Sequence, residues 1–318
     1  MPMSNRQLLS VVLSFRNEDG VISELVNRLG GALEPLGLDY ELIFVNDAST
    51  DSSLQLLLEI AGRDPRVKII SMSRTFGVSQ CVLAGMSYAR GDAVVYMDAD
   101  LQDPPEVIPE LVKNWREGAD VVYTTRLDRQ GESLFKMWLT KWAYKILRST
   151  SSDFSLPVDS GDFKLLSRRV VRELLQLTEK DPFLRGLVSW IGFKQVSVKY
   201  HRDARYAGST HYPLISLNPW RAFIAGLASF SVMPLYLSLY FGMLISIGSF
   251  SYIIAIIVMF FLGWNIPGWS AIMVTVLFLG GVQLLVLGVL GIYLGRVSNE
   301  VKNRPNYIVE STIGFDDK

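Results

Sequence analysis

Residues 93–104 read AVVYMDADLQDP, an apolar run that ends in a cluster of acidic side chains. Asp98 and Asp100 are one residue apart, and Gln102 and Asp103 follow at once. Apolar strands do not usually end in this way, because charged groups are costly to take out of water. The stretch therefore predicts a buried strand whose end carries a polar site.

Four more segments in the first half of the chain have the composition of β-strands, at residues 8–15, 41–49, 67–73 and 120–126. Residues 21–37 and 51–63 lie between them and repeat apolar residues at helical spacing. Strands that alternate with helices predict an α/β domain, in which helices cover both faces of a mostly parallel sheet.

Polar side chains follow the ends of four of these predicted strands. In parallel sheets with helices on both faces, ligands bind outside the carboxyl ends of the strands. The polar residues at these ends are Asn17 and Glu18 in the first, Asp47 in the second, Asp98 and Asp100 in the fourth, and Arg126 in the fifth. We expect the four clusters to share one edge of the sheet and to form one site.

Two aspartates one residue apart at a strand end bring hard oxygen ligands together, and these suit Mg²⁺ or Mn²⁺. Aspartate is also common in turns, so Asp98 and Asp100 have a purely structural alternative. Asp103 precedes two prolines and is expected to be a turn residue. Two residues expected at the same edge of the sheet favour the metal site. Asp47 is placed to hydrogen-bond a base or ribose, and Arg126 is placed to bind a phosphate.

Several classes of protein find no support in the sequence. Basic and acidic residues number 31 each, so charge does not indicate a nucleic-acid partner. No Walker A, G-x-G-x-x-G, H-E-x-x-H or G-x-S-x-G pattern occurs, which argues against P-loop nucleotidases and dinucleotide dehydrogenases. His201 and His211 lack the spacing of metal ligands. Cys81 is the single cysteine, so no intrachain disulfide can form, and we expect a buried structural thiol.

Residues 222–295 contain no Asp, Glu, Lys, Arg or His, a run of 74 residues. Its length accommodates two membrane spans of about 20 residues each. We expect these spans at about 233–262 and 269–294, with the tryptophan-edged link 263–269 at the far interface. A buried helical hairpin in a soluble protein is the alternative.

Basic residues flank this hairpin on both sides: Arg221, Arg296, Lys302 and Arg304. By the positive-inside rule, both termini and the soluble domain are predicted to lie in the cytoplasm. Residues 215–232 are predicted to form a juxtamembrane interfacial helix that leads into the first span. The aromatic and basic residues of 133–148 suit either a second membrane-surface helix or a core-facing amphipathic helix.

Six motifs follow one another in the order of a known family: SFRNEDG (14–20), VNDASTD (45–51), MDADLQDPPE (97–106), DSGDFKLLSR (159–168), FLRGLVSWIGF (183–193) and GRVSNEVKNRPNYIV (295–309). The chain resembles the family 2 glycosyltransferases that act on polyprenyl phosphates, in particular the bactoprenol glucosyltransferases, with dolichol-phosphate mannose synthases as related enzymes. The resemblance covers nearly the whole chain. It implies a GT-A catalytic domain over 1–214, the interfacial helix 215–232, a transmembrane hairpin over 233–295 and a cytoplasmic tail over 296–318.

The same resemblance implies a metal-dependent, inverting transfer of a sugar to undecaprenyl phosphate at the cytoplasmic face of the inner (plasma) membrane. Glucose from UDP-glucose is the favoured donor, with GDP-mannose or a UDP-amino sugar as alternatives. The lipid-linked product would serve O-antigen or cell-surface glycan modification, through a separate flippase and a downstream transferase, and self-association as a homo-oligomer is expected. A different function, either as a processive polysaccharide synthase or as a non-enzymatic, membrane-tethered binding module, stays open.

Individual residues receive roles from this resemblance. It implies metal binding by Asp98, Asp100 and Gln102, with Mg²⁺ or Mn²⁺ as the ion. It implies nucleotide-sugar contacts at Ser14, Asn17, Glu18, Asp47, Asp98 and Arg126. Asp162, Asp159 and Asp100 are the catalytic candidates, and Asp162 is favoured. Basic positions for the acceptor phosphate are Arg202, Arg205 and His211, of which the two arginines have a solvated face near anionic lipid as their alternative.

These residue types suit the implied reaction. A divalent cation stabilises the charge that develops on a departing nucleoside diphosphate. The acceptor phosphate has a second pKa of about 6, so it is largely ionised at neutral pH and needs little help from a base. We therefore expect Asp162 to orient the sugar hydroxyls rather than to remove a proton, and the arginines to position the acceptor.

Overall fold

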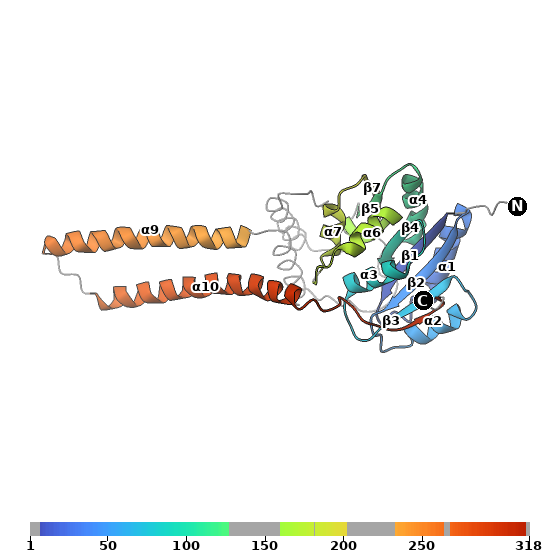
Figure 1. Cartoon of the computed structure of the whole chain (residues 1–318), viewed down its shortest axis with the longest axis horizontal. Helices are drawn as coiled ribbons and strands as arrows, with labels where there is room; N and C mark the ends of the chain where they lie inside the picture. Colours follow the sequence, from blue (N-terminus) through green and yellow to red (C-terminus); the bar gives the residue numbers. More distant parts are fainter. Residues whose placement is uncertain (1–6, 127–159, 181, 202–232, 264–267, 316–318) are drawn as a thin grey trace. The chain divides into compact units, whose positions relative to one another are not determined.

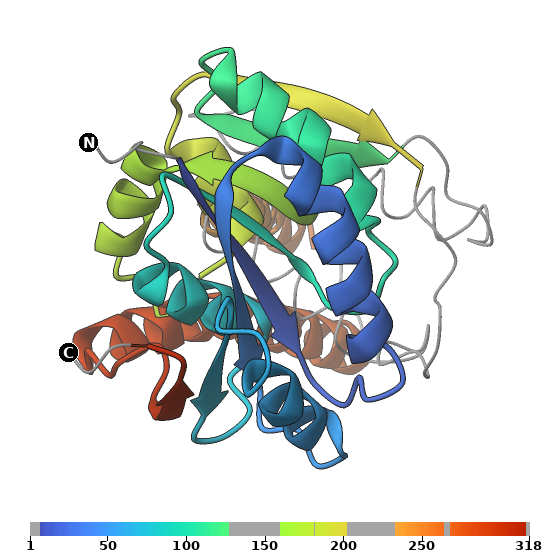
Figure 2. The same ribbon diagram turned by 90° about the vertical axis from the view of Figure 1, so that its right-hand side faces the viewer.

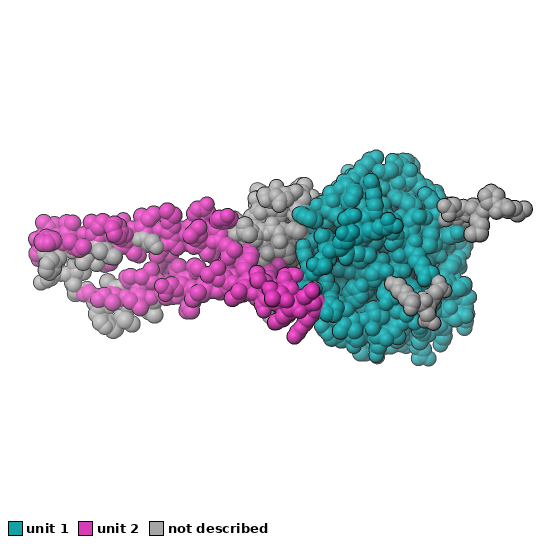
Figure 3. Space-filling view, in the orientation of Figure 1, with its two compact units in different colours: residues 1–226, 305–318 teal, residues 227–304 magenta. Residues whose placement is uncertain are grey.

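The computed structural model describes residues 7–126, 160–180, 182–201, 233–263 and 268–315. The chain divides into two compact units, one formed by residues 1–226 with 305–318 and the other by residues 227–304 (Figure 3). The first unit is built around a β-sheet, and the second consists of long helices.

The sheet of the first unit has eight strands in the order β7-β5-β6-β4-β1-β2-β3-β8 (Figure 1). The strands are β1 (Leu8–Phe15), β2 (Asp39–Asn46), β3 (Val67–Met72), β4 (Ala93–Asp98), β5 (Val121–Arg126), β6 (Ser160–Ser167), β7 (Gln195–Tyr200) and β8 (Val309–Ile313). Strands β4, β1, β2 and β3 run parallel to one another, and β5 runs parallel to β7. Strands β6 and β8 are antiparallel to their neighbours. The sheet is therefore mixed and mostly parallel, as the sequence predicts.

Helices cover both faces of this sheet (Figure 2). Strands β1, β2 and β4 are apolar almost throughout and buried, which is typical of parallel sheets with two covered faces. On one face α1 (Ile22–Leu33) contacts α2 (Ser53–Ala61) and α4 (Ile108–Arg116). On the other face α3 (Val78–Tyr88) contacts α6 (Arg168–Gln176), and α7 (Leu184–Trp190) contacts β6. Short 3-10 helices η1 (Glu34–Leu36) and η2 (Pro105–Val107) follow α1 and precede α4.

The strand directions bring the predicted polar clusters to one edge of the sheet. Strands β1, β2, β4, β5 and β7 all end at this edge, which we call the C-terminal edge, and the antiparallel β6 begins there. The five sequence-predicted strands are confirmed, with boundaries that differ by a few residues. Cys81 is fully buried in α3, as expected.

The opposite, N-terminal edge holds a buried polar network around Glu41 of β2, which is 4% exposed. One carboxylate oxygen of Glu41 accepts from the hydroxyl of Ser10 at 2.5 Å and from the backbone N–H of Arg90 at 2.7 Å. The other accepts from Nζ of Lys68 at 2.7 Å. The N–H of Gly91 donates to Ser10 Oγ at 2.8 Å, so the network joins β1, β2, β3 and the segment before β4.

Residues after the second long helix return to the sheet. The sequence predicts a tail over 296–318, and within it Val309–Ile313 form β8, which pairs with the edge strand β3. Before β8, the Asn306 amide donates to the Glu179 carbonyl at 2.8 Å, and the Tyr307 hydroxyl donates to Ser87 Oγ at 3.0 Å. The end of the chain thus folds as part of the first unit.

The second unit contains α9 (Met233–Phe261) and α10 (Trp269–Val301), which contact each other. Leu235–Met259 and Phe278–Val301 are both long and apolar enough to cross a membrane. Their large apolar side chains are exposed to an unusual degree, for example Leu244 at 68% and Leu284 at 72%. A helical hairpin buried in the core of a soluble protein does not fit such exposure.

Candidate active site

Three strand ends at the C-terminal edge carry left-handed backbone conformations. Asn17, Ala48 and Leu101 have φ angles of 56°, 54° and 56°. Asparagine tolerates this region, but an alanine or a buried leucine there costs about 1–2 kcal/mol. Strain of this kind concentrates at functional sites, where the surrounding fold enforces it. The loops after β1, β2 and β4 therefore mark this edge as the candidate site.

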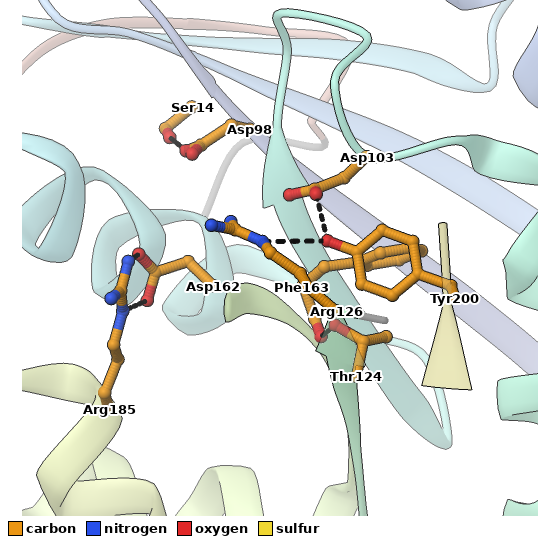
Figure 4. Close-up of polar contacts among 9 residues, drawn as sticks. All are labelled: Ser14, Asp98, Asp103, Thr124, Arg126, Asp162, Phe163, Arg185 and Tyr200. Carbon is orange, nitrogen blue, oxygen red and sulfur yellow. Dashed lines mark hydrogen bonds and ion pairs between the residues drawn. The ribbon is translucent and has the colours of Figure 1, made fainter. Parts of the chain in front are cut away.

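The acidic loop after β4 is built around Asp98 and Asp100. Asp98 ends the strand, and Ser14 of β1 lies beside it with its hydroxyl 3.5 Å from Asp98 Oδ1 (Figure 4). Asp100 is 7% exposed, and its Oδ1 accepts the backbone N–H of Gln102 at 3.1 Å across the left-handed Leu101. The loop thus holds the D-x-D pair on a tight turn, and Gln102 contributes to it through its backbone.

The carboxylates of this edge repel one another. Burial, together with the charges of Asp162, Asp100 and Asp103, raises the pKa of Asp98 to about 7. Within the described ranges, no group of three His, Cys, Asp or Glu side chains forms a complete metal site. Mg²⁺ is usually held by only one or two carboxylates, with substrate phosphates and waters completing its shell. Asp98, whose pKa is raised by the neighbouring carboxylates, and Asp100 two residues later are oxygen ligands of the kind that suits such a cation.

The loops after β1 and β2 are tied to each other by their predicted site residues. The side-chain oxygen of Asn17 accepts the backbone N–H of Thr50 at 2.8 Å, and the Asn17 N–H donates to Ser49 Oγ at 3.1 Å. The N–H of Glu18 donates to Ser53 Oγ at 2.8 Å. Asn17 and Glu18 therefore lie at the C-terminal edge as expected, and their roles in nucleotide binding stay predictions.

Asp47 organises the loop between β3 and α3. Its two carboxylate oxygens accept the backbone N–H groups of Phe76 at 2.7 Å and Gly77 at 3.1 Å. The side chain is 7% exposed, and Gly77 has a φ of 101° that favours glycine. Asp47 thus fixes the neighbouring loop at this edge, and the predicted contact with a base or ribose would use its remaining lone pairs.

Asp162 of β6 forms a half-buried ion pair that sequence reasoning missed. The Nε of Arg185 in α7 donates to Asp162 Oδ1 at 2.7 Å, and its Nη2 donates to Oδ2 (Figure 4). Burial alone would raise the pKa of Asp162, but the charge and hydrogen bonds of Arg185, with Lys164 and Arg126, hold it below the usual 3.8. Asp162 is therefore a carboxylate at neutral pH and a weak base.

Lys164 lies two residues further along β6 and is 1% exposed. Burial lowers its pKa to about 8, against the opposing effect of Asp162. Its register partner on β4 is Tyr96, whose buried hydroxyl has no hydrogen-bond partner within the described residues. The positive charge of Lys164 thus lies inside the sheet, opposite a residue two positions before Asp98 at the C-terminal edge.

Arg126 ends β5 and reaches the same site. Its Nε donates to the hydroxyl of Tyr200 at 3.3 Å, and that hydroxyl donates in turn to the carboxylate of Asp103 (Figure 4). Asp103 lies in a bend before Pro104, as predicted, but it is also 1% exposed and accepts a buried hydrogen bond. The structure therefore gives Asp103 more than a turn role.

Part of the predicted site lies outside the described residues. This holds for Asp159, Arg202, Arg205 and His211, and for the segments 133–148 and 215–232. The structure brings together Ser14, Asp98, Asp100, Arg126 and Asp162, and it adds Arg185, Tyr200 and Lys164. Arg185 and Lys164 are charged residues inside the family motifs, so their charge could have drawn attention. Tyr200 lies outside those motifs, and no pattern in the sequence marks it.

Comparisons with known proteins show the family of this chain. Residues 10–175 match the model of glycosyl transferase family 2. The chain is 45% identical over 317 residues to the glycosyltransferase YkcC of Bacillus subtilis, covering 99% of this chain and 97% of that one. It is 37% identical over 305 residues to a bactoprenol glucosyl transferase of Shigella flexneri, covering 96% and 98%.

A solved structure shares the fold. The glucosyl-3-phosphoglycerate synthase of Mycobacterium tuberculosis, in complex with Mn²⁺, UDP and phosphoglyceric acid, is 23% identical, with a TM-score of 0.50 over 70% of this chain and 78% of that one. At this identity the likeness shows the GT-A-like fold alone. The family match spans more than half of the chain and the relatives align over nearly all of it, so this protein belongs to glycosyl transferase family 2.

Proposed function

We propose that this glycosyltransferase transfers glucose from UDP-glucose to a polyprenyl phosphate, with undecaprenyl phosphate as the acceptor, at the cytoplasmic face of a membrane. The observation that carries the proposal is the presence, on one chain, of an acidic and arginine-containing sheet edge and of two helices long and apolar enough to span a bilayer. Relatives named bactoprenol glucosyl transferases, alignable over nearly the whole chain, support both substrates.

The donor end of the site would use Asp98, Asp100 and Arg126. A divalent cation held by the two aspartates would offset the charge on the nucleoside diphosphate as it leaves. Arg126 keeps its two Nη groups free of any hydrogen bond or ion pair within the described part of the chain. A guanidinium presents such groups in a fork that matches phosphate oxygens.

The reaction forms a bond between an acceptor phosphate oxygen and the anomeric carbon of the sugar, and it breaks the bond from that carbon to the diphosphate. Attack from the face opposite the leaving group inverts the anomeric centre. Asp162 keeps its charge because Arg185 is paired with it, so its oxygens can accept hydrogen bonds from sugar hydroxyls. Arg202, Arg205 and His211 are proposed to hold the acceptor phosphate close to that carbon.

The two long helices explain how such a domain meets its acceptor. A polyprenyl chain stays in the bilayer, and only its phosphate reaches water, so the catalytic unit gains from being held at the surface. Helices α9 and α10 are proposed to provide this anchor, with both termini in the cytoplasm.

The deciding experiment offers a panel of nucleotide sugars to the purified full-length chain with undecaprenyl phosphate and Mg²⁺ or Mn²⁺, and identifies the lipid product by mass. We expect a hexose-phosphate lipid from UDP-glucose, released UDP, and loss of the reaction on chelation. Product from GDP-mannose or a UDP-amino sugar alone would replace glucose as the donor. No product from any donor would refute the proposal.

A further inference from the structure

Arg126 has a long flexible side chain, yet it makes only one hydrogen bond within the described residues, from Nε to the Tyr200 hydroxyl. That contact holds Nε, and neither Nη group bonds to another residue in the described ranges, so both can meet a ligand. Figure 4 shows the guanidinium extending from Tyr200 toward the side where Asp98 and Asp162 lie, and its charge acts on Asp162. The orientation of Arg126 therefore depends on Tyr200.

The Tyr200 hydroxyl is itself held in one orientation. Its single hydrogen is donated to Asp103, so its oxygen can only accept from Arg126. Burial, and then the charge of Asp103, raises the pKa of Tyr200 to about 12, so the phenol stays protonated at physiological pH. The result is a directed chain of donors from Arg126 through Tyr200 to the acidic loop after β4.

Packing fixes the ring as firmly as the hydroxyl. Tyr200 is 4% exposed and meets Phe163 of β6 edge to face, with ring centroids 6.1 Å apart. Thr124 of β5 donates to the Phe163 carbonyl at 2.9 Å. Contacts among the three neighbouring strands β5, β6 and β7 therefore fix the ring of Tyr200, and with it the position of its hydroxyl.

A glycine leaves room for the guanidinium on its other side. A Cβ added at Gly161 of β6 would lie 3.1 Å from Arg126 Nη2 and 3.6 Å from its Cζ. The first of these contacts is tighter than ordinary van der Waals distance, so a side chain at this position would make the Arg126 guanidinium shift by a few tenths of an ångström. Tyr200 thus holds Arg126 by a hydrogen bond, and Gly161 leaves the space that the guanidinium occupies.

We propose that Tyr200 is a positioning residue, which aims the free Nη groups of Arg126 at the diphosphate of the donor, and that Gly161 keeps the space this arrangement needs. The proposal rests on the proposed function, because it takes the ligand of Arg126 to be a nucleoside diphosphate. It adds a residue at the last position of β7, directly before the segment that is predicted to hold the acceptor phosphate.

The test compares Tyr200→Phe, which keeps the ring and removes only the hydroxyl, with the wild type in full-length protein. Dissociation constants for UDP and for uridine are measured by calorimetry in the presence of Mn²⁺. We expect Tyr200→Phe to weaken UDP about tenfold and to leave uridine unchanged, because a misdirected Arg126 loses phosphate contacts only. Gly161→Ala should show the same phosphate-specific loss.

A double-mutant cycle separates positioning from a general effect on the fold. Arg126→Ala alone should weaken UDP, and adding Tyr200→Phe to it should cause no further loss, because Tyr200 acts through Arg126. Tyr123→Phe is the matched control: it lies three residues before Arg126 on β5, and within the described residues its hydroxyl makes no hydrogen bond. It should bind UDP as the wild type does.

The outcomes distinguish this inference from the proposed function. Unchanged UDP affinity in Tyr200→Phe, equal losses for UDP and uridine, or additive losses in the cycle would each overturn the positioning role. Because these measurements need no acceptor lipid, a wild type that binds UDP but forms no lipid product would overturn the proposed function alone. Failure of the wild type to bind UDP would overturn both.

Discussion

The two edges of the central sheet bury charge in opposite ways. At the N-terminal edge, Glu41 accepts from Ser10, from the Arg90 backbone and from Lys68. Burial would raise its pKa, but these donors hold it below the usual 4.5. At the C-terminal edge, burial and neighbouring carboxylates raise the pKa of Asp98 to about 7. The fold gives Glu41 hydrogen-bond donors and a positive charge, whereas it places further carboxylates beside Asp98.

This difference separates a structural network from a functional site. A buried polar group that finds all its partners within the fold stabilises one arrangement of the strands. Groups with strongly perturbed pKa values in an incompletely neutralised cluster mark places where a ligand completes the charge balance. Around Asp98, the C-terminal edge brings four aspartates together, Asp98, Asp100, Asp103 and Asp162, and the cationic side chains that act on them within the described residues are Arg126, Arg185 and Lys164.

The largest expected effect comes from Asp98→Asn. Turnover should fall by roughly 1,000-fold, because a metal site contributes several kcal/mol to stabilising the leaving group. The melting temperature of the metal-free protein should stay the same or rise, because one of several repelling charges is removed. Lipid product formation and thermal unfolding in detergent measure the two quantities. A variant that loses stability together with activity would instead give Asp98 a structural role.

Sequence patterns alone predict which residues lie at the C-terminal edge of the sheet. Strand-forming runs that alternate with helical ones predict a mostly parallel sheet, and parallel strands deliver the residues after each strand to the same edge. Asp98, Asp47 and Arg126 follow strands in this way, and the structure places all three at the C-terminal edge. This inference needs only chain direction and periodicity.

The interactions within the edge required information that no local pattern contains. Strand β6 inserts antiparallel between β4 and β5, and this insertion brings Lys164 opposite Tyr96 of β4 and the charge of Asp162 close to Asp98. The contact between Tyr200 and Asp103 joins residues 97 positions apart. Strand β8 is only five residues long, follows an apolar helix, and pairs with β3 far away in the sequence. Such pairings depend on tertiary register rather than on propensity.

The second largest effect should come from the opposite edge. Glu41→Ala leaves the ammonium of Lys68, whose side chain is 13% exposed, without its buried partner. Removing one member of a buried pair costs about 3 kcal/mol, which lowers the melting temperature by several degrees. Turnover per folded molecule at a permissive temperature should not change, because the network lies at the edge away from the site. A loss of turnover in the folded fraction would contradict the separation of the two edges.

Asp162→Asn tests whether the acidic edge uses a base. Turnover should fall by about tenfold, because the amide weakens the pairing with Arg185, and the pH dependence should keep the wild-type shape. A loss of about 1,000-fold or more, with a changed pH profile, would instead indicate proton transfer. Asp120→Asn is the matched control: Asp120 also pairs with an arginine, Arg169, but at the N-terminal edge, so turnover should be unaffected.

A smaller effect is expected in the way the free energy of unfolding falls at acid pH, to which Glu41 contributes. Glu41 has a folded pKa below its usual 4.5, so its contribution is present above pH 4.5 and is lost as the pH falls through the folded pKa. The difference in unfolding free energy between the wild type and Glu41→Gln should therefore be constant well above pH 4.5 and shrink as the pH falls below 4.5 through the folded pKa of Glu41. Hydrogen exchange of β2 peptides at several pH values measures it. A difference that grows with acid would contradict the direction of the shift.

The smallest effect should come from an ion pair with good geometry but little burial. Arg28 donates to Glu106 through Nε at 2.8 Å and Nη2 at 2.7 Å, and their side chains are 25% and 53% exposed. Glu106→Gln should cost about 0.5 kcal/mol or less, and the cost should vanish at high salt, because water and ions screen exposed charges. Thermal unfolding at two salt concentrations, run beside Glu41→Ala, makes the comparison. Equal losses in the two variants would show that pairing, rather than burial, decides what a charge contributes in this fold.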